Sequence, residues 1–190
     1  MTDVAAAVRE ARATELERLG SDRGLLALTD ADLSGETIRA RLAASDLAVA
    51  AALDAWREED SPAGDAFAAT AARNRDHAET VAPEAPAADA DPVAEALSSH
   101  TEAAARVGAA LVGYPLVADG RYLQAVSFFV NEADEASADQ FRTVRAETSE
   151  ALDTAAELLS EGDADAAEAA AIAVVDEAYD AYVESLDAMG

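Results

Sequence analysis

Apolar residues recur at every third or fourth position along nearly the whole chain, and alanine is the dominant residue. This spacing is the period of an amphipathic α-helix, and alanine is the residue that favours a helix most. Aromatic residues make up only 5 % of the chain. They and the β-branched residues are too few and too scattered to build a sheet. The sequence therefore predicts an all-α fold.

Capping and helix-breaking residues divide this pattern into segments. Ser34 and the pair Ser61-Pro62 are typical helix starts, and Pro115 is expected to break the chain after the helix that begins at Pro92. Gly162-Asp163 stops one helix and caps the last one. The predicted helices span residues 2–19, 21–28, 35–59, 62–82, 92–113, 122–130 and 136–160, with a last helix through 172–189.

The connections between these segments predict how they pack. Only a short turn separates 35–59 from 62–82, so the two helices should form an antiparallel hairpin with Trp56 buried opposite Phe67. Residues 83–92, which are rich in proline, alanine and aspartate, are the one clear linker, either a crossover or a boundary between two halves. We expect one bundle domain over 1–190, with further bundle helices in 93–190.

The charge of the chain is its most unusual compositional feature. Acidic residues outnumber lysine and arginine by 39 to 13, for a formal net charge of −26, and the chain has no lysine. Such a charge destabilises a compact domain by self-repulsion at low salt, but at molar salt the Debye length falls to about 3 Å. We interpret the composition as halophilic adaptation to a high-salt cytoplasm. An acidic interaction protein and a nucleic-acid mimic are the other interpretations.

Several classes of function are excluded by what the chain lacks. Without cysteine it forms no disulfide and has no thiolate chemistry, and it contains no P-loop, dinucleotide-binding glycine motif or hydrolase elbow. The arginines are dispersed, which argues against direct binding to nucleic acid. No apolar run approaches the roughly 20 residues of a membrane span, and Met1–Arg12 is a charged helical segment rather than a signal peptide. We therefore expect a cytoplasmic protein.

The two histidines, His77 and His100, both fall on apolar stripes, where so polar a residue is unusual. The spacing Asn74-x-x-His77 puts an amide and an imidazole on one helix face, as the Glu-x-x-His pairs of metal-binding bundles do. The hairpin brings Asp46 opposite His77. Glu15 lies on the stripe of the first helix, where a bundle would place a bridging carboxylate. These residues are candidate metal ligands.

The segment Phe67–Val81, with Leu53-Asp-Ala-Trp56 before it, resembles the helical core of rubrerythrin-like proteins in the ferritin-like superfamily. The resemblance covers roughly residues 1–82. It implies a ferritin-like antiparallel bundle with additional C-terminal helices, and members of the family bind two irons for peroxidase or oxidase chemistry. The four cysteines of the rubredoxin-like iron site in rubrerythrins are missing from this chain.

Carried over position by position, the resemblance makes Glu15 a ligand glutamate, Asp46 a shortened ligand and His77 a ligand histidine. Val49 and Asn74 depart from the family pattern, because valine cannot bind iron and an amide is a poor substitute for a bridging carboxylate. Arg73 and Arg75 beside Asn74 would repel a cation.

These departures favour a vestigial site and a protein that is not an enzyme. We expect a non-catalytic, rubrerythrin-like module without a cofactor, which acts in regulation or interaction through a protein partner or through self-association. Asp46 should then pair with His77 or an arginine, because an unpaired buried carboxylate is costly. The alternative is a metal-binding oxidative-stress protein, with iron in an atypical di-iron or mononuclear site.

Overall fold

The computed structural model describes residues 3–56, 61–88 and 90–190, which form helices, turns and loops and contain no strand. A single turn of 3₁₀-helix, Glu161–Asp163, precedes the last helix. The α-helices are α1 (Val4–Ala11), α2 (Ala13–Leu19), α3 (Asp22–Leu28), α4 (Gly35–Asp54), α5 (Pro62–Val81), α6 (Pro92–Ser98), α7 (Ala103–Gly108), α8 (Tyr114–Asn131), α9 (Glu135–Leu158) and α10 (Ala164–Met189). The prediction of an all-α fold is confirmed for the described residues.

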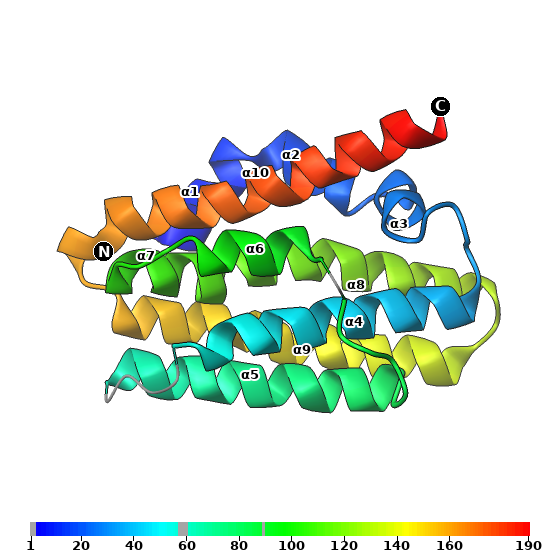
Figure 1. Ribbon diagram of the computed structural model, residues 1–190, viewed down its shortest axis with the longest axis horizontal. Helices are drawn as coiled ribbons and strands as arrows, with labels where there is room; N and C mark the ends of the chain where they lie inside the picture. Colours follow the sequence, from blue (N-terminus) through cyan, green and yellow to red (C-terminus); the bar gives the residue numbers. More distant parts are fainter. Residues whose placement is uncertain (1–2, 57–60, 89) are drawn as a thin grey trace.

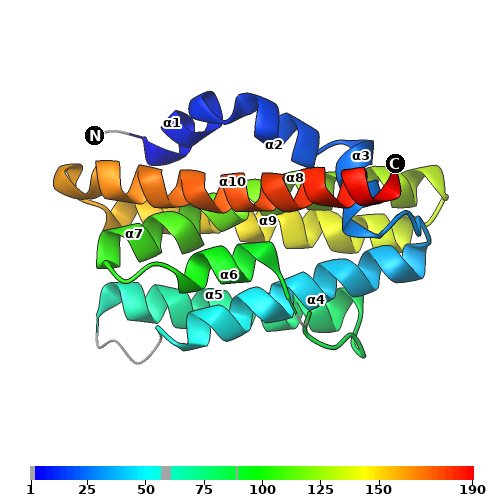
Figure 2. The same ribbon diagram turned by 45° about the horizontal axis from the view of Figure 1, so that its top comes forward.

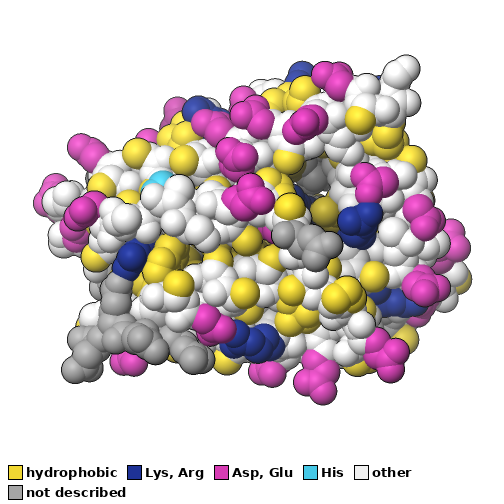
Figure 3. Space-filling view, in the orientation of Figure 1, with side chains coloured by type: hydrophobic (Ala, Val, Ile, Leu, Met, Phe, Trp, Pro, Cys, Tyr) yellow, Lys and Arg dark blue, Asp and Glu magenta, His cyan; other side chains and the backbone are white. Residues whose placement is uncertain are grey.

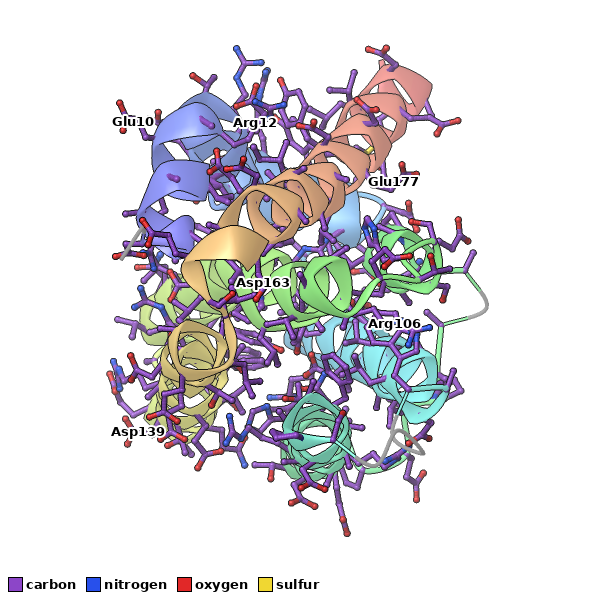
Figure 4. The ribbon with its side chains drawn as sticks, turned by 90° about the vertical axis from the view of Figure 1, so that its left-hand side faces the viewer. Glu10, Arg12, Arg106, Asp139, Asp163 and Glu177 are labelled. Atoms are coloured by element: carbon purple, nitrogen blue, oxygen red, sulfur yellow. The ribbon has the colours of Figure 1, made fainter. Side chains whose placement is uncertain are left out.

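Two helical hairpins form the largest packed unit of the molecule. Helix α4 packs along α5, and α8 packs along α9. The hairpins meet where α5 contacts α9 and where α4 contacts α8, so that the four helices run side by side (Figures 1 and 4). The long connection between the hairpins contains the linker, α6 and α7.

Helix α10 covers this unit from one side (Figure 2). It packs against α6, α7 and α8 and also carries α1, α2 and α3. Buried apolar residues from before and after the linker belong to one hydrophobic cluster. The linker is therefore a crossover within one core.

The local signals at the helix starts are confirmed. The side chains of Ser34 and Ser61 accept hydrogen bonds from the backbone N–H groups of Thr37 and Gly64, at 3.2 and 3.1 Å. Trp56 is buried against Phe67, with ring centroids 5.2 Å apart in an edge-to-face arrangement. Helix α4 ends at Asp54, and the predicted end of this helix at residue 59 lies outside the described residues.

The first predicted helix, 2–19, is divided in two at Arg12. This residue leaves helical geometry, with φ −126° and ψ 34°. Its guanidinium donates to both carboxylate oxygens of Asp176 on α10, at 2.5 and 2.9 Å, and Figure 4 shows it beside that helix. The break directs both short helices along α10, which a single straight helix would not follow.

The predicted break at Pro115 is wrong. The helical path is interrupted earlier, between Ser98 and Ala103, and then continues through the proline. A π-helical turn, Ala109–Gly113, precedes Tyr114, whose backbone N–H donates to the carbonyl of Ala109. A proline normally clashes with the carbonyl four residues before it. The wider π turn relieves that clash, so the helical path continues from α7 through Tyr114 and Pro115 into α8.

Candidate functional site

Polar side chains gather inside the unit formed by α4, α5, α8 and α9, where an apolar core would be expected. Each is less than one-tenth exposed, and each lies on one of the four paired helices. We call them the interior polar set: Asp46 on α4, Asn74 and His77 on α5, Tyr114 and Tyr122 on α8, and Thr148 on α9.

Asp46 is the only acidic member of this set, and two tyrosines hold it. Its Oδ1 accepts a hydrogen bond from the Tyr114 hydroxyl at 3.1 Å and a short one from the Tyr122 hydroxyl. The two hydroxyl oxygens lie 3.5 Å apart. The two tyrosines are eight residues apart on α8, about two turns, and therefore reach the same carboxylate.

The environment of Asp46 favours its neutral form. Burial raises the pKa of Asp46 to about 7 from a usual value of 3.8, and the hydrogen bonds from the two tyrosines oppose that rise. The charge of Asp91 raises this pKa further, and that of Arg121 lowers it. Burial and the charge of Asp46 raise the pKa of both the Tyr114 and Tyr122 hydroxyls, so both hydroxyls stay protonated.

His77 is bound to α9. Its Nε2 lies 2.8 Å from Oε2 of Glu147. Arg73 donates to the backbone carbonyl of Glu147 at 2.8 Å and pairs with Glu150 at 3.3 Å. Burial lowers the pKa of His77, and Glu147 opposes that change. Because a carboxylate only accepts hydrogen bonds, we assign the proton of the neutral ring to Nε2, which leaves Nδ1 as an acceptor.

Four buried atoms of the interior polar set have no hydrogen-bond partner among the described residues. They are Oδ2 of Asp46, Nδ2 of Asn74, Nδ1 of His77 and Oγ1 of Thr148. An unpaired buried polar atom costs about 1–3 kcal/mol relative to a paired one. The set therefore lowers the stability of the bundle interior.

Two other candidate residues from the sequence lie elsewhere. Glu15 is on α2, partly exposed, beside Arg12 and Arg18. Helix α2 packs on α8 and α10, so Glu15 is on the outer side of α8. His100 lies in the turn between α6 and α7, where burial lowers its pKa and where its Nε2 has no partner among the described residues. The structure thus places Asp46 and His77 in the bundle interior but not Glu15.

The expected partner of Asp46 is corrected by this geometry. Among the described residues, neither His77 nor an arginine donates to the carboxylate of Asp46; its hydrogen bonds come from the two tyrosines of α8, both to Oδ1. His77 in turn is engaged by Glu147. The attraction of Arg121 for Asp46 acts without a hydrogen bond.

The donor set does not fit a di-iron centre. Such centres in four-helix bundles take one glutamate from each of two helices and a Glu-x-x-His pair from each of the other two. Here α5 presents Asn74 and His77, α8 presents tyrosines, and α9 presents Thr148 together with Glu147, whose carboxylate is bound to His77. Within the described ranges, no three His, Cys, Asp or Glu side chains lie close enough to hold one metal ion.

A second feature, outside the bundle interior, was missed from the sequence. Ser45 on α4 donates to Oδ2 of Asp91 at 2.7 Å, and Nη1 of Arg121 lies 3.5 Å from the Ser45 hydroxyl. These three residues belong to the lining of a hollow of about 520 Å³ that faces α10. Ser45 falls in the sequence between the apolar residues Leu42 and Val49 at helical spacing, and a serine at such a position is a weak signal of a polar contact there.

The described part of the chain has no helix that is both long enough and apolar enough to cross a membrane. A scan against protein-family models, a search of curated proteins and a search of solved structures each find no match to this chain.

Proposed function

We propose that this chain is a degenerate, rubrerythrin-like protein of the ferritin-like type, without catalytic activity, that acts as an interaction or regulatory module. The path of the chain supports the ferritin-like part of this proposal. Two antiparallel hairpins joined by one long crossover are the arrangement of ferritin-like bundles, and α4–α5 and α8–α9 follow it.

One observation carries the non-catalytic part: the carboxylate of Asp46 is occupied by tyrosine hydroxyls. Where a metal centre would need a further carboxylate from the facing helix, α8 supplies Tyr114 and Tyr122 instead. Hydroxyls that donate to Oδ1 satisfy that oxygen without a metal. Asp46 and His77 are then the remnants of a ligand set, and the side chains around them are too few to bind iron for catalysis.

A second candidate function is favoured by the two acceptor atoms left unpaired, Oδ2 of Asp46 and Nδ1 of His77. A buried carboxylate oxygen and a buried imidazole nitrogen are both metal ligands. In this alternative the protein is a metal-binding oxidative-stress protein with one atypical mononuclear site.

The two functions are separated by metal content. The protein is expressed with iron supplied, purified at molar potassium chloride and dialysed, and iron per chain is then measured with a near-ultraviolet spectrum. We expect no stoichiometric iron and no absorption band of an oxo-bridged pair. Two irons per chain would overturn the proposal, and one retained iron would favour the mononuclear alternative.

The double variant Asp46→Asn with His77→Gln is the control for this experiment, because the acidic surface binds cations by itself. Iron that is equally abundant in the variant belongs to the surface. The module proposal also predicts that this variant replaces the native chain in cells that lack it. A folded double variant that fails to do so would contradict a function located outside the bundle interior.

A further inference from the structure

The 520 Å³ hollow lies between α3, α4, α8, α10 and the linker, with Arg121 contributed by α8. Figure 3 shows the surface hollowed between the C-terminal half of α10 and α4. The linker is fixed to α4 at this point by a hydrogen bond from the Ala88 N–H to the Ala44 carbonyl, at 3.2 Å. Small side chains on α4, the linker and α10 leave the space open; they include Ala40, Ala44, Ala87, Ala88, Ala178 and Ala181.

The polar part of the hollow is a partly buried arginine that has no acidic partner. Arg121 lines the cavity, and its one hydrogen bond within the described residues is the long one to Ser45. No described carboxylate lies within 4.0 Å of its guanidinium, whereas other partly buried arginines each pair with one: Arg12, Arg39, Arg73 and Arg145.

The neighbouring acid does not satisfy this arginine. Both carboxylate oxygens of Asp91 are engaged, Oδ2 by the Ser45 hydroxyl and Oδ1 by the backbone N–H of Ala94 at the start of α6. The other arginine in the lining, Arg41, pairs with Asp30. Arg121 therefore has free N–H donors beside an apolar cavity.

The chemistry of the ligand follows from these features. A guanidinium presents N–H groups in a planar fork that matches a carboxylate, and a hollow of 300–1,000 Å³ with mostly apolar walls and few polar groups is typical of a small-molecule site. A dianion is disfavoured, because Asp91 lies close by and Arg121 is the one lining arginine without an acidic partner among the described residues. The walls provide surface for an aliphatic body.

We propose that this hollow binds a small organic monocarboxylate, with its carboxylate on Arg121 and its apolar body along the alanine-rich walls. This inference goes beyond the proposed function, because it concerns a different part of the molecule and holds whatever the bundle interior binds. Binding of such a ligand would allow a small molecule to regulate the proposed module.

The test is a titration of the full chain with hexanoate, followed by calorimetry or ligand-observed NMR at one fixed concentration of potassium chloride. Hexanamide, which has the same body without the charge, is the comparison ligand. We expect saturable binding of hexanoate and at least about tenfold weaker binding of hexanamide.

Two variants probe the two parts of the site. Arg121→Gln removes the fork and should weaken hexanoate binding about tenfold or more, while Arg142→Gln, on the exposed side of α9, removes the same charge elsewhere and should not. Ala181→Leu fills the hollow and should abolish binding with Arg121 intact, whereas Ala173→Leu at an exposed position of α10 should not. Circular dichroism confirms that each variant is folded.

The proposal is overturned if hexanoate shows no saturable binding, if hexanamide binds equally well, or if Arg121→Gln binds like the native chain. If Arg121→Gln does not fold, the proposal is tested by comparing hexanoate binding to Ala181→Leu and to Ala173→Leu. Equal binding by these two variants would place the carboxylate outside the hollow.

Discussion

At the scale of single residues, Asp46 shows what the bundle interior tolerates. The residue is 2 % exposed, and its carboxylate is held by hydroxyls instead of by a cation. A buried charge without a direct counter-charge shifts its pKa until the neutral form is populated. The stability of the folded protein therefore depends on pH through this position, whereas an apolar residue there would give no such dependence.

Asp46→Asn should stabilise the protein at pH 8. Asp46 loses its proton at about pH 3.8 when unfolded and about pH 7 when folded. Between these values the folded state binds more protons, so this residue lowers the free energy of unfolding as pH rises, with the full cost of about 4 kcal/mol reached above pH 7. Asparagine keeps an oxygen for both tyrosines without the charge.

Denaturant unfolding from pH 4 to pH 8 at fixed high salt measures this effect. The advantage of Asp46→Asn over the native chain should be near zero at pH 4 and should grow toward pH 8. Asp180→Asn, at an exposed position of α10, controls for the loss of one negative charge. An Asp46→Asn variant that is less stable than the native chain by the same amount at every pH would show that the carboxylate charge is not the cause.

At the scale of helices, the sequence predicts what depends on local chemistry. The starts of α4 and α5 follow from Ser34 and Ser61, since a side-chain oxygen before an apolar stripe is a local signal. No local signal predicts the π turn before Pro115, because this turn depends on packing against α10. The expected break at Pro115 also separated Tyr114 from Tyr122 into different segments, which concealed the two partners of Asp46.

The candidate site, like the helices, could be predicted from the sequence only where it depends on short-range features. Asp46 and His77 follow from helix periodicity and the hairpin, both of which are short-range. The outlying position of Glu15 depends on which long helix α2 lies against, and α10 begins well over a hundred residues later in the chain. The Arg121 hollow likewise combines distant segments, namely α3, α4, the linker, α8 and α10. Hydrophobic periodicity predicts which face of a helix is buried, but it does not predict which other helix packs against that face.

Gly108→Ala should loosen the contact between α7 and α10. A Cβ at this position would lie 2.1 Å from the backbone oxygen of Ala167, so one helix has to move away. We expect a loss of about 1–3 kcal/mol in the free energy of unfolding. Gly162→Ala, where the nearest neighbouring atom is the Ser160 hydroxyl at 3.9 Å, should be neutral or stabilising by about 0.5 kcal/mol. Denaturant midpoints at fixed salt compare the two, and equal effects would contradict the close helix approach.

At the scale of the whole molecule, a small-residue core has to hold together a highly charged surface. Many of the buried residues are alanine, and each alanine buries less apolar area than a leucine or phenylalanine. The formal net charge of −26 adds self-repulsion that grows as screening weakens. The balance between the two therefore depends on the ionic strength of the solution.

The melting temperature should fall as potassium chloride is lowered from molar concentration to about 0.1 M, where the Debye length grows from about 3 Å to about 10 Å. Circular dichroism measures this directly.

The double variant Glu177→Gln with Asp180→Asn removes two exposed negative charges from α10, and Figure 4 shows Glu177 on the outer side of that helix. If repulsion is the cause, the variant should melt higher than the native chain at low salt and equally at molar salt. A native melting temperature that does not change with salt would contradict the halophilic interpretation, and a variant advantage of the same size at every salt concentration would show that the gain comes from local contacts rather than from screening.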